Sequence, residues 1–286
     1  MNLSRCLLAC DGNPDYLGFY PLVRRAWREV VGINTLLVLV AEEIPSSLHQ
    51  FEPEIVLFRP LAGISTAFQA QCIRLLYPAL LETEDGGAII ISDMDMAPLG
   101  ERYFNAPLAH VGGDQFVSYR AGLLDEYEQL AICYNAATPQ VWAEVFPGVN
   151  DEGDVEDRLR EWWADIAEDY RLRDGAGWST DQTQLYRYVR RWSDGVGAGR
   201  VTPVEDRSNG FLRLDRTELS QFRKRLHHRS HLLRAGRVSD FHMMQPSDEY
   251  TALNQQAIDE ALKPASAVDR ARGALRAAIR YRRPRG

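Results

Sequence analysis

The sequence predicts an α/β fold in which a mostly parallel central sheet is flanked by helices. Short apolar runs alternate with segments whose apolar residues recur at helical spacing. Strands that alternate with helices form a mostly parallel sheet covered on both faces, which explains why these runs are apolar throughout. The composition, with 45% hydrophobic and 26% charged residues over 286 positions, is that of a globular protein with a sizeable core.

The expected elements follow one another in the first hundred residues. Strands are expected in four apolar runs, at 6–10, 34–41, 54–60 and 86–92. Helices are expected between them at 16–31 and 65–82, and Ser65 or Thr66 can cap the second helix. In sheets of this kind, ligands bind outside the carboxyl ends of the strands. The residues that follow the strands are therefore the first candidates for a binding site.

Charge and hydropathy argue against several classes of protein. The formal net charge of −7 argues against a nucleic-acid-binding protein, whose binding surface is basic. The apolar runs are shorter than the ~20 residues of a membrane span, and the N-terminal segment becomes polar too soon for a signal peptide. The four cysteines lie inside apolar runs without metal-ligand spacing. We therefore expect a cytoplasmic protein with reduced core cysteines, namely Cys6, Cys10, Cys72 and Cys133.

The C-terminal segment differs in charge from the rest of the chain. Residues 269–286 carry seven arginines and one acid. We expect residues 251–286 to form a helical basic tail, either packed on a main domain at 1–250 or extending from it. Such a tail can contact an anionic membrane peripherally, or it can be a solvated helix end.

The stretch "GGAIIISDMDMAPLG", residues 86–100, contains the most informative motif. Its apolar strand ends on Asp93 and Asp95, and residues two apart in an extended chain point to the same side. Two carboxylates brought together raise the pKa of one of them unless a cation compensates their charge. Oxygen ligands suit Mg²⁺ or Mn²⁺, and such an ion keeps positions open for phosphate oxygens. The alternative is an acidic turn that faces solvent.

The order of motifs resembles the GT-A glycosyltransferases, which hold a metal and a nucleotide-sugar diphosphate with an Asp-x-Asp motif. Within them it is most similar to the glycogenin and galactosyltransferase-like branch, over roughly residues 5–245. "IRLLYPALLETEDGGAIIISDMDM" resembles the helix, proline and strand that lead to the motif. "CYNAATPQVWAEVF" resembles the branch's Asn-Ala-Gly strand and the helix after it. "WSTDQTQLYRYV" resembles its Asp-Gln element, and "RVSDFHMM" its late strand with a histidine.

The resemblance implies roles for four residues at the donor. Arg74 would approach the donor, and Asn135 would meet hydroxyls of the donor sugar. Asp181 and Gln182 would lie beside the transferred sugar. Each has a structural alternative: Arg74 can pair with an acid, Asn135 can satisfy backbone groups at a strand-to-helix junction, and Asp181 can stabilise a helix N-terminus capped by Ser179 or Thr180.

The resemblance also implies a metal site. His242 would be the third ligand beside Asp93 and Asp95, and a neutral imidazole suits Mn²⁺. The chain departs from the branch in two places. Ala137 stands where the branch has glycine, and "HMMQPSDEY" replaces the glycine and lysine-proline pair that clamp the diphosphate. Membership of the branch is less well supported by these motifs than membership of the GT-A class.

Two further groups of polar residues have open interpretations. Asp11 and Asn13 follow the first strand and would hold the nucleotide base or ribose, although "DGNPD" is equally a run of turn formers. His227, His228 and His231 lie in a basic amphipathic segment and are expected at the surface.

The expected function is metal-dependent transfer of a sugar from a nucleoside-diphosphate sugar, with UDP the first nucleotide to test, to a glycan, protein or lipid-linked hydroxyl. The branch favours retention of configuration, in which the donor phosphate takes the proton, whereas inversion would need Asp181 as base. Three alternatives remain. A haloacid-dehalogenase-type phosphatase also has Asp-x-Asp after a strand, although its motif normally opens the chain. A sugar-nucleotide pyrophosphorylase would need a glycine-rich loop near the first strand, and a carbohydrate-binding relic would have lost turnover.

Overall fold

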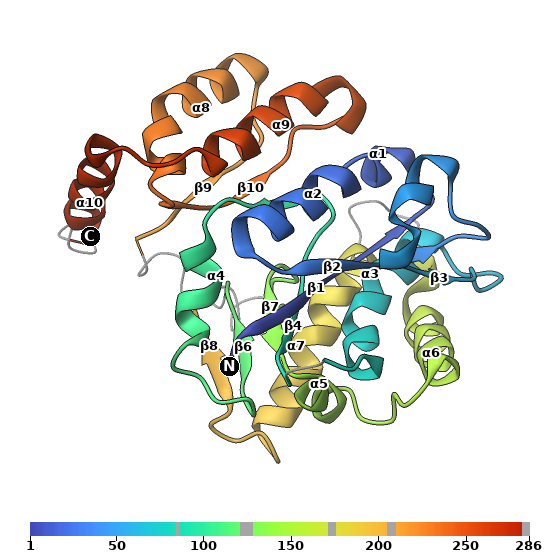
Figure 1. Ribbon diagram of the computed structural model, residues 1–286. Coiled ribbons are helices and arrows are strands. Elements are labelled where there is room, and N and C mark those ends of the chain that lie inside the picture. Colours follow the sequence, from blue (N-terminus) through green and yellow to red (C-terminus); the bar gives the residue numbers. More distant parts are fainter. Residues whose placement is uncertain (84–85, 121–127, 171–175, 205–209, 282–286) are drawn as a thin grey trace. The chain divides into compact units, whose positions relative to one another are not determined.

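The computed structural model describes residues 1–83, 86–120, 128–170, 176–204 and 210–281 (Figure 1). The chain forms two compact units, and each is assembled from segments that are distant in the sequence. The first unit comprises Met1–Asn13, Thr35–Asp93 and His110–Val204, and the second comprises Pro14–Asn34, Met94–Ala109 and Glu205–Gly286. The predicted boundary between 250 and 251 falls inside helix α9, Ser247–Leu262, and the division into domains stays a prediction.

The first unit contains a seven-stranded sheet with the order β3-β2-β1-β4-β7-β6-β8. The pairs β1–β4, β2–β3 and β6–β8 are parallel, and β7 runs antiparallel to both of its neighbours. The predicted α/β fold with a mostly parallel sheet is confirmed. The strands are β1 (Leu3–Asp11), β2 (Asn34–Val40), β3 (Ile55–Phe58), β4 (Ala88–Ile91), β6 (Phe116–Ser118), β7 (Asn135–Ala137) and β8 (Val201–Pro203).

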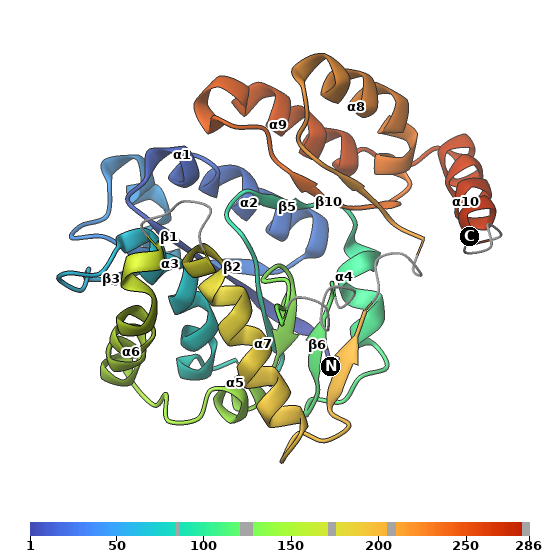
Figure 2. The same ribbon diagram turned by 180° about the vertical axis from the view of Figure 1, so that it is seen from behind.

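The helices of this unit pack against one another beside the sheet, as Figures 1 and 2 show. They are α3 (Thr66–Leu76), α5 (Pro139–Val145), α6 (Glu152–Tyr170) and α7 (Thr180–Ser193), with 3₁₀ turns at Ser46–Glu54, Tyr77–Leu80 and Ala176–Ser179. The predicted helix at 65–82 thus forms α3 and the 3₁₀ turn after it. Neither Ser65 at its N-cap nor Ser179 before α7 makes a capping side-chain bond, whereas Thr138 caps α5 by accepting from Val141 N.

Period-two alternation places one face of the sheet in the helix-covered core. Alternate residues of the inner strands are buried in one cluster with side chains from all four helices. From the strands these are Leu7, Ala9, Val38, Val40, Ile89 and Ile91, and from the helices they include Phe68, Trp142, Leu159 and Leu185. Burying this many large apolar side chains is the main favourable term in folding this unit.

The second unit contains a three-stranded sheet, β5-β10-β9, with β5 (Met96–Pro98), β9 (Leu212–Leu214) and β10 (Val238–His242). Strand β10 pairs antiparallel with β5 and parallel with β9. The predicted helix at 16–31 is divided into α1 (Pro14–Leu17), α2 (Tyr20–Ala26) and a π-helical turn (Trp27–Val31). The other helices are α4 (Glu101–Leu108), α8 (Leu219–Arg234), α9 and α10 (Ala267–Tyr281).

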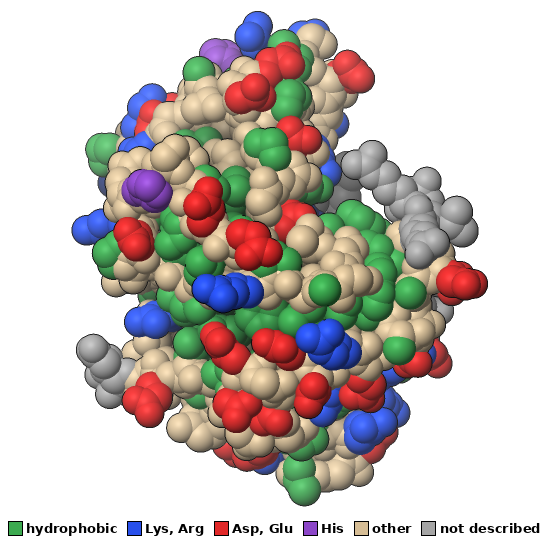
Figure 3. All heavy atoms as spheres, turned by 90° about the vertical axis from the view of Figure 1, so that its right-hand side faces the viewer, with side chains coloured by type: hydrophobic (Ala, Val, Ile, Leu, Met, Phe, Trp, Pro, Cys, Tyr) green, Lys and Arg blue, Asp and Glu red, His purple; other side chains and the backbone are tan. Residues whose placement is uncertain are grey.

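Several expectations about composition can be compared with the structure. All four cysteines are buried and free, as predicted. Of the described helices, none combines the length and apolarity that crossing a bilayer requires. The face drawn in Figure 3 shows acidic and basic side chains intermixed. The tail is helical over α10, and its residues 282–286 lie outside the described part of the chain.

Candidate functional site

One edge of the seven-stranded sheet gathers residues from several strands. Strand β1 ends at Asp11, β4 ends two residues before Asp93, and β6, which runs in the same direction, ends at Ser118. Strand β7 runs in the opposite direction, so its first residue, Asn135, lies at this same edge and pairs with both Ile91 and Ser118. This is the carboxyl edge of the parallel strands, where the sequence predicts the ligand.

Arg74 joins the two aspartates predicted to lie near the donor. It lies in the last turn of α3, with only 8% of its side chain exposed. Its Nη1 donates to Asp93 Oδ1, and its Nη2 donates to Asp181 Oδ2 at 2.8 Å. Asp181 is in the first turn of α7, which packs on α3, and its side chain is 4% exposed. Asp93 therefore has a protein cation as its partner.

Burial and pairing shift the pKa values of the three groups in different directions. Burial raises the pKa of Asp93, but the charge of Arg74 and hydrogen bonds from Cys133 and Arg74 outweigh it, so its pKa lies below the usual range. For Asp181 burial dominates over Arg74, and its pKa is raised. Burial lowers the pKa of Arg74, but both aspartates oppose it and the net shift is upward. The guanidinium is therefore a permanent charge in this cluster.

Two residues near Asp93, Arg120 and Cys133, were not predicted from the sequence to belong to the site. Arg120 follows β6, and its guanidinium carbon lies 5.2 Å from the centroid of the Tyr134 ring. Its Nη1 donates to Cys133 Sγ at 3.2 Å, and the Cys133 thiol is hydrogen-bonded to Asp93. The sequence contains one signal for each: Arg120 comes two residues after the end of a strand, and Cys133 lies two residues before the motif asparagine. Cys133 was interpreted only as a core residue, and it is also part of this cluster.

Asp11 lies in the predicted turn, and Asn135 bonds backbone groups, although these belong to the segment before β7 and not to the predicted strand-to-helix junction. Asp11 accepts from Asn13 N at 3.2 Å, as in a turn, and from Thr66 Oγ1 at 2.9 Å. Asn135 Nδ2 donates to Ala131 O at 2.8 Å and to Ile132 O at 2.9 Å. These bonds do not occupy the whole of either side chain, so the predicted donor contacts remain predictions.

The second unit brings Asp95 and His242 together. Strand β10 pairs with β5 so that His242 lies opposite Met96, and Met243 N donates to Asp95 O at 2.9 Å. His242 Nε2 lies 3.1 Å from Asp95 Oδ2. The same oxygen accepts from Arg216 Nη1 at 3.2 Å and Gln245 Nε2 at 3.4 Å.

The Asp95–His242 contact is a hydrogen bond, and it brings together two of the three residues predicted to hold a divalent cation. Two ligand atoms each ~2.1 Å from an octahedral ion are about 3.0 Å apart when adjacent, which matches the observed nitrogen–oxygen spacing. A carboxylate oxygen with an imidazole nitrogen suits Mn²⁺. Within the described part of the chain, no group of three or more His, Cys, Asp and Glu side chains is arranged to hold a metal. The metal and its three predicted ligands, Asp93, Asp95 and His242, therefore remain predictions.

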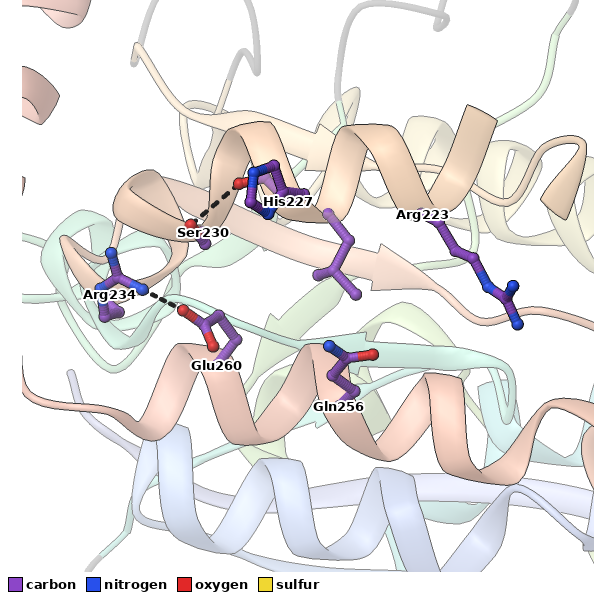
Figure 4. A pocket seen from close by; sticks show the side chains of 7 residues that line it. Arg223, His227, Ser230, Arg234, Gln256 and Glu260 are labelled. Atoms are coloured by element: carbon purple, nitrogen blue, oxygen red, sulfur yellow. Dashed lines mark hydrogen bonds and ion pairs between the residues drawn. The ribbon is translucent and has the colours of Figure 1, made fainter. Parts of the chain in front are cut away.

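A separate pocket of about 480 Å³ lies between α8 and α9 in the second unit (Figure 4). In Figure 4, Arg234 and Glu260 point toward each other across it. None of the residues predicted for the donor or the metal lines this pocket, which is formed by Arg223, Leu226, His227, Ser230, Arg234, Gln256 and Glu260. Of the three histidines expected at the surface, His227 and His228 are exposed on α8 and His231 is partly buried.

Solved structures that resemble this chain include several glycosyltransferases. No protein-family model matches the chain, and no curated protein matches it. Similar solved structures include the glycosyltransferase GlyE of Streptococcus pneumoniae TIGR4, with 10% identity and a TM-score of 0.46 over 98% of this chain and 63% of that chain. The galactosyltransferase LgtC, in complex with donor and acceptor sugar analogues, has 13% identity and a TM-score of 0.43 over 87% of this chain and 95% of that chain. A glycosyltransferase involved in the glycosylation of the major capsid of PBCV-1 has 11% identity and a TM-score of 0.41 over 90% of this chain and 98% of that chain.

Proposed function

We propose that this protein is a metal-dependent glycosyltransferase of the GT-A type. The observation that carries the proposal is the convergence of Arg74, Asp93 and Asp181 at the ligand edge of the sheet. Each had been assigned to the donor site from a different motif of the sequence. A solvent-facing acidic turn, the alternative for Asp93, would not need a buried arginine that bridges it to a third element.

The roles of the side chains follow from their contacts. Arg74 holds both carboxylates in place and supplies positive charge where a donor diphosphate would bind. Asp181 accepts from Arg74 with one oxygen and from Gln182 N with the other. Because both of its oxygens are engaged, Asp181 suits positioning of the donor sugar better than proton abstraction. This favours the retaining course of the reaction.

Asp95 and His242 would hold the divalent ion, Mn²⁺ or Mg²⁺, and Asp93 remains the predicted further ligand. When bound, such an ion offsets the charge that develops on a departing nucleoside diphosphate. UDP-sugars are the first donors to test, and the acceptor is a glycan, protein or lipid-linked hydroxyl. The exposed residues of α10 would let the protein contact a membrane peripherally.

A thermal-shift screen tests the proposal. Nucleoside diphosphates and UDP-sugars are added with and without Mn²⁺, and a metal-dependent rise in Tm for one nucleotide is expected because a ligand that binds only the folded state stabilises it. The Arg74→Met variant should lose this rise, and Arg190→Met, an exposed arginine of α7, should keep it. If no nucleotide raised the Tm of the wild type, the proposal would fail.

A further inference from the structure

An aromatic side chain just before α7 is exposed to solvent. Four large apolar side chains are exposed in the described part of the chain, and Trp178, at 39%, is the aromatic one. It lies in the 3₁₀ turn Ala176–Ser179, three residues before Asp181. An isolated exposed apolar residue is ordinary on a protein surface, so the surroundings of Trp178 decide what it can bind.

The turn that carries Trp178 is fixed on the end of α6. Gly177 is buried, and a Cβ atom at this position would lie 2.7 Å from Tyr170 N and 2.9 Å from Tyr170 Cα. Only glycine allows so close an approach of the two backbones. Thr180 Oγ1 donates to Gly177 O at 2.6 Å and joins the turn to the start of α7. The backbone of Trp178 is therefore held in one place.

The indole is the most exposed member of an aromatic cluster. The ring centroids of Trp178 and Tyr170 are 5.6 Å apart and the ring planes are inclined by 27°, which is a stacked arrangement. The ring of Tyr170 packs edge-on against Phe68 at 5.5 Å and Trp163 at 5.4 Å. Phe68 belongs to the buried core of this unit. The indole therefore rests on a rigid support, and its exposed surface is available to a ligand.

The stacked pair lies at the ligand edge of the sheet. Burial raises the pKa of the Tyr170 hydroxyl, and the charges of Asp181 and Asp11 are among those that raise it further. The hydroxyl therefore lies within electrostatic range of both carboxylates. It donates to Gln71 Oε1 of α3 at 2.9 Å. Trp178 is thus an apolar plane beside the residues predicted to hold the donor.

The chemistry of this position suits a sugar ring. A pyranose has an apolar face of C–H groups that can pack on an aromatic ring while its hydroxyls stay hydrated. The Asp181 side chain is 4% exposed, so a transferred sugar beside it would be enclosed by protein. A ring that stacks on the exposed Trp178 stays partly in water. This second environment suits the acceptor, which enters from solvent and returns to it.

We propose that Trp178 binds the acceptor by stacking on one of its sugar rings. The inference rests on the proposed glycosyltransferase function and deepens it, because it selects a glycan acceptor over a bare protein or lipid hydroxyl. A nucleotide base can also stack on an indole, so the test has to distinguish the acceptor from the nucleotide.

The test measures nucleotide and sugar binding separately. The methyl glycosides of glucose, galactose and N-acetylglucosamine are titrated in the presence of UDP and Mn²⁺, and saturation-transfer difference NMR detects their binding. The wild type should bind at least one glycoside, and Trp178→Ala should weaken that binding about tenfold or more. Trp178→Phe keeps an aromatic plane and should retain most of the affinity, whereas Trp178→Leu should behave like Trp178→Ala. Isothermal titration should show UDP affinity unchanged in all three variants.

A matched control is Val196→Ala. Val196 is also an exposed apolar residue, and it lies beyond the other end of α7. This variant should bind UDP and the glycoside as the wild type does. The Tm of each unliganded variant is also measured. Because phenylalanine and leucine are similar in size, the comparison of Trp178→Phe with Trp178→Leu separates a loss of stacking from a loss of stability.

The outcomes separate this inference from the proposed function. If the wild type binds neither UDP nor a UDP-sugar, the proposed function fails and the inference fails with it. If the wild type binds UDP but no glycoside, or if Trp178→Ala and Trp178→Leu bind the glycoside as the wild type does, only the inference is overturned. A loss of UDP affinity in Trp178→Ala would assign the indole to the nucleotide base and would likewise overturn it.

Discussion

Arg74 Nη2 and Asp181 Oδ2 lie 2.8 Å apart, although 107 residues separate them in the sequence. The ion pair joins the last turn of α3 to the first turn of α7, and the other arm of the guanidinium reaches Asp93 at the end of the sheet. A planar guanidinium can donate to two carboxylates in fixed directions, which an ammonium group cannot do in the same way. The cluster therefore holds α3, α7 and the end of the sheet together, and its three residues also belong to the candidate site.

Removal of Arg74 should destabilise the protein strongly. Arg74→Met leaves the buried Asp181 and the partly buried Asp93 without their cation, and breaking the buried pair with Asp181 in this way costs about 3–5 kcal/mol of unfolding free energy. Urea denaturation measures the loss. Arg190→Met, which breaks an exposed pair with Asp194, should cost less than about 1 kcal/mol. If both variants lost the same free energy of unfolding, the Arg74 cluster would contribute no more to stability than an exposed ion pair does.

Replacing Asp181 separates positioning from base catalysis. Asp181→Asn keeps the shape of the side chain but weakens its bond to Arg74, so we expect KM for the donor to rise about tenfold or more with a smaller change in kcat. Steady-state kinetics and titration with donor measure the two effects. A base role predicts a different pattern, namely a fall in kcat of about 10²–10⁴ with donor affinity intact.

The Asp95–His242 pair should determine metal affinity. We expect Asp95→Asn and His242→Gln each to weaken Mn²⁺ binding about tenfold or more, because each removes one ligand atom from the pair. Electron paramagnetic resonance of free Mn²⁺ during titration measures the change. His227→Gln, an exposed histidine of the same unit, is the matched control and should bind as the wild type does. Unchanged affinity in both site variants would remove this pair from the metal site.

Attachment of α10 should depend on pH through Asp269. Hydrogen bonds from Arg234 and from Ser266 lower the pKa of Asp269 well below its usual value of 3.8. A carboxyl whose pKa is depressed by folding stabilises the folded state above its unfolded pKa, and this stabilisation is lost as the pH falls. The Tm difference between wild type and Asp269→Asn should therefore be constant from pH 7 to 5 and shrink below about 3.8.

The exposed Asp157 of α6 gives the control for this measurement. The Tm difference between wild type and Asp157→Asn should be small at every pH. A difference for Asp269→Asn that stayed the same down to pH 3 would mean that the Asp269 charge does not hold α10.

Helix α10 should bind anionic vesicles. Val268 and Leu275 are 58% and 64% exposed, Arg272 is exposed between them at helical spacing, and Arg270 is exposed on another side of the helix. Each arginine near an anionic surface contributes about 1 kcal/mol, so replacing both by glutamine should weaken binding roughly 30-fold. Sedimentation with vesicles of anionic and neutral lipids measures it, and activity on a soluble acceptor should not change. Binding that is equally weak for the wild type would favour the solvated helix end.

Much of this protein could be predicted from local patterns. Apolar runs and helical spacing located the strands and helices of the first hundred residues, because period and burial are properties of short segments. Strand ends located Asp11 and Asp93, since the carboxyl edge of a parallel sheet follows from strand order. Residue type also indicated which side chains could hold a phosphate or a metal.

Tertiary structure alone decided how these side chains are paired. That Arg74 bridges Asp93 and Asp181, that Asp95 meets His242 and Arg216, and that Ser118 lies opposite Asn135 follow from packing and register between segments far apart in the chain. The assembly of each unit from separated segments could not be predicted either. The physical reason is that local sequence determines what a segment buries, whereas the partner it buries against is selected by the free energy of the whole fold.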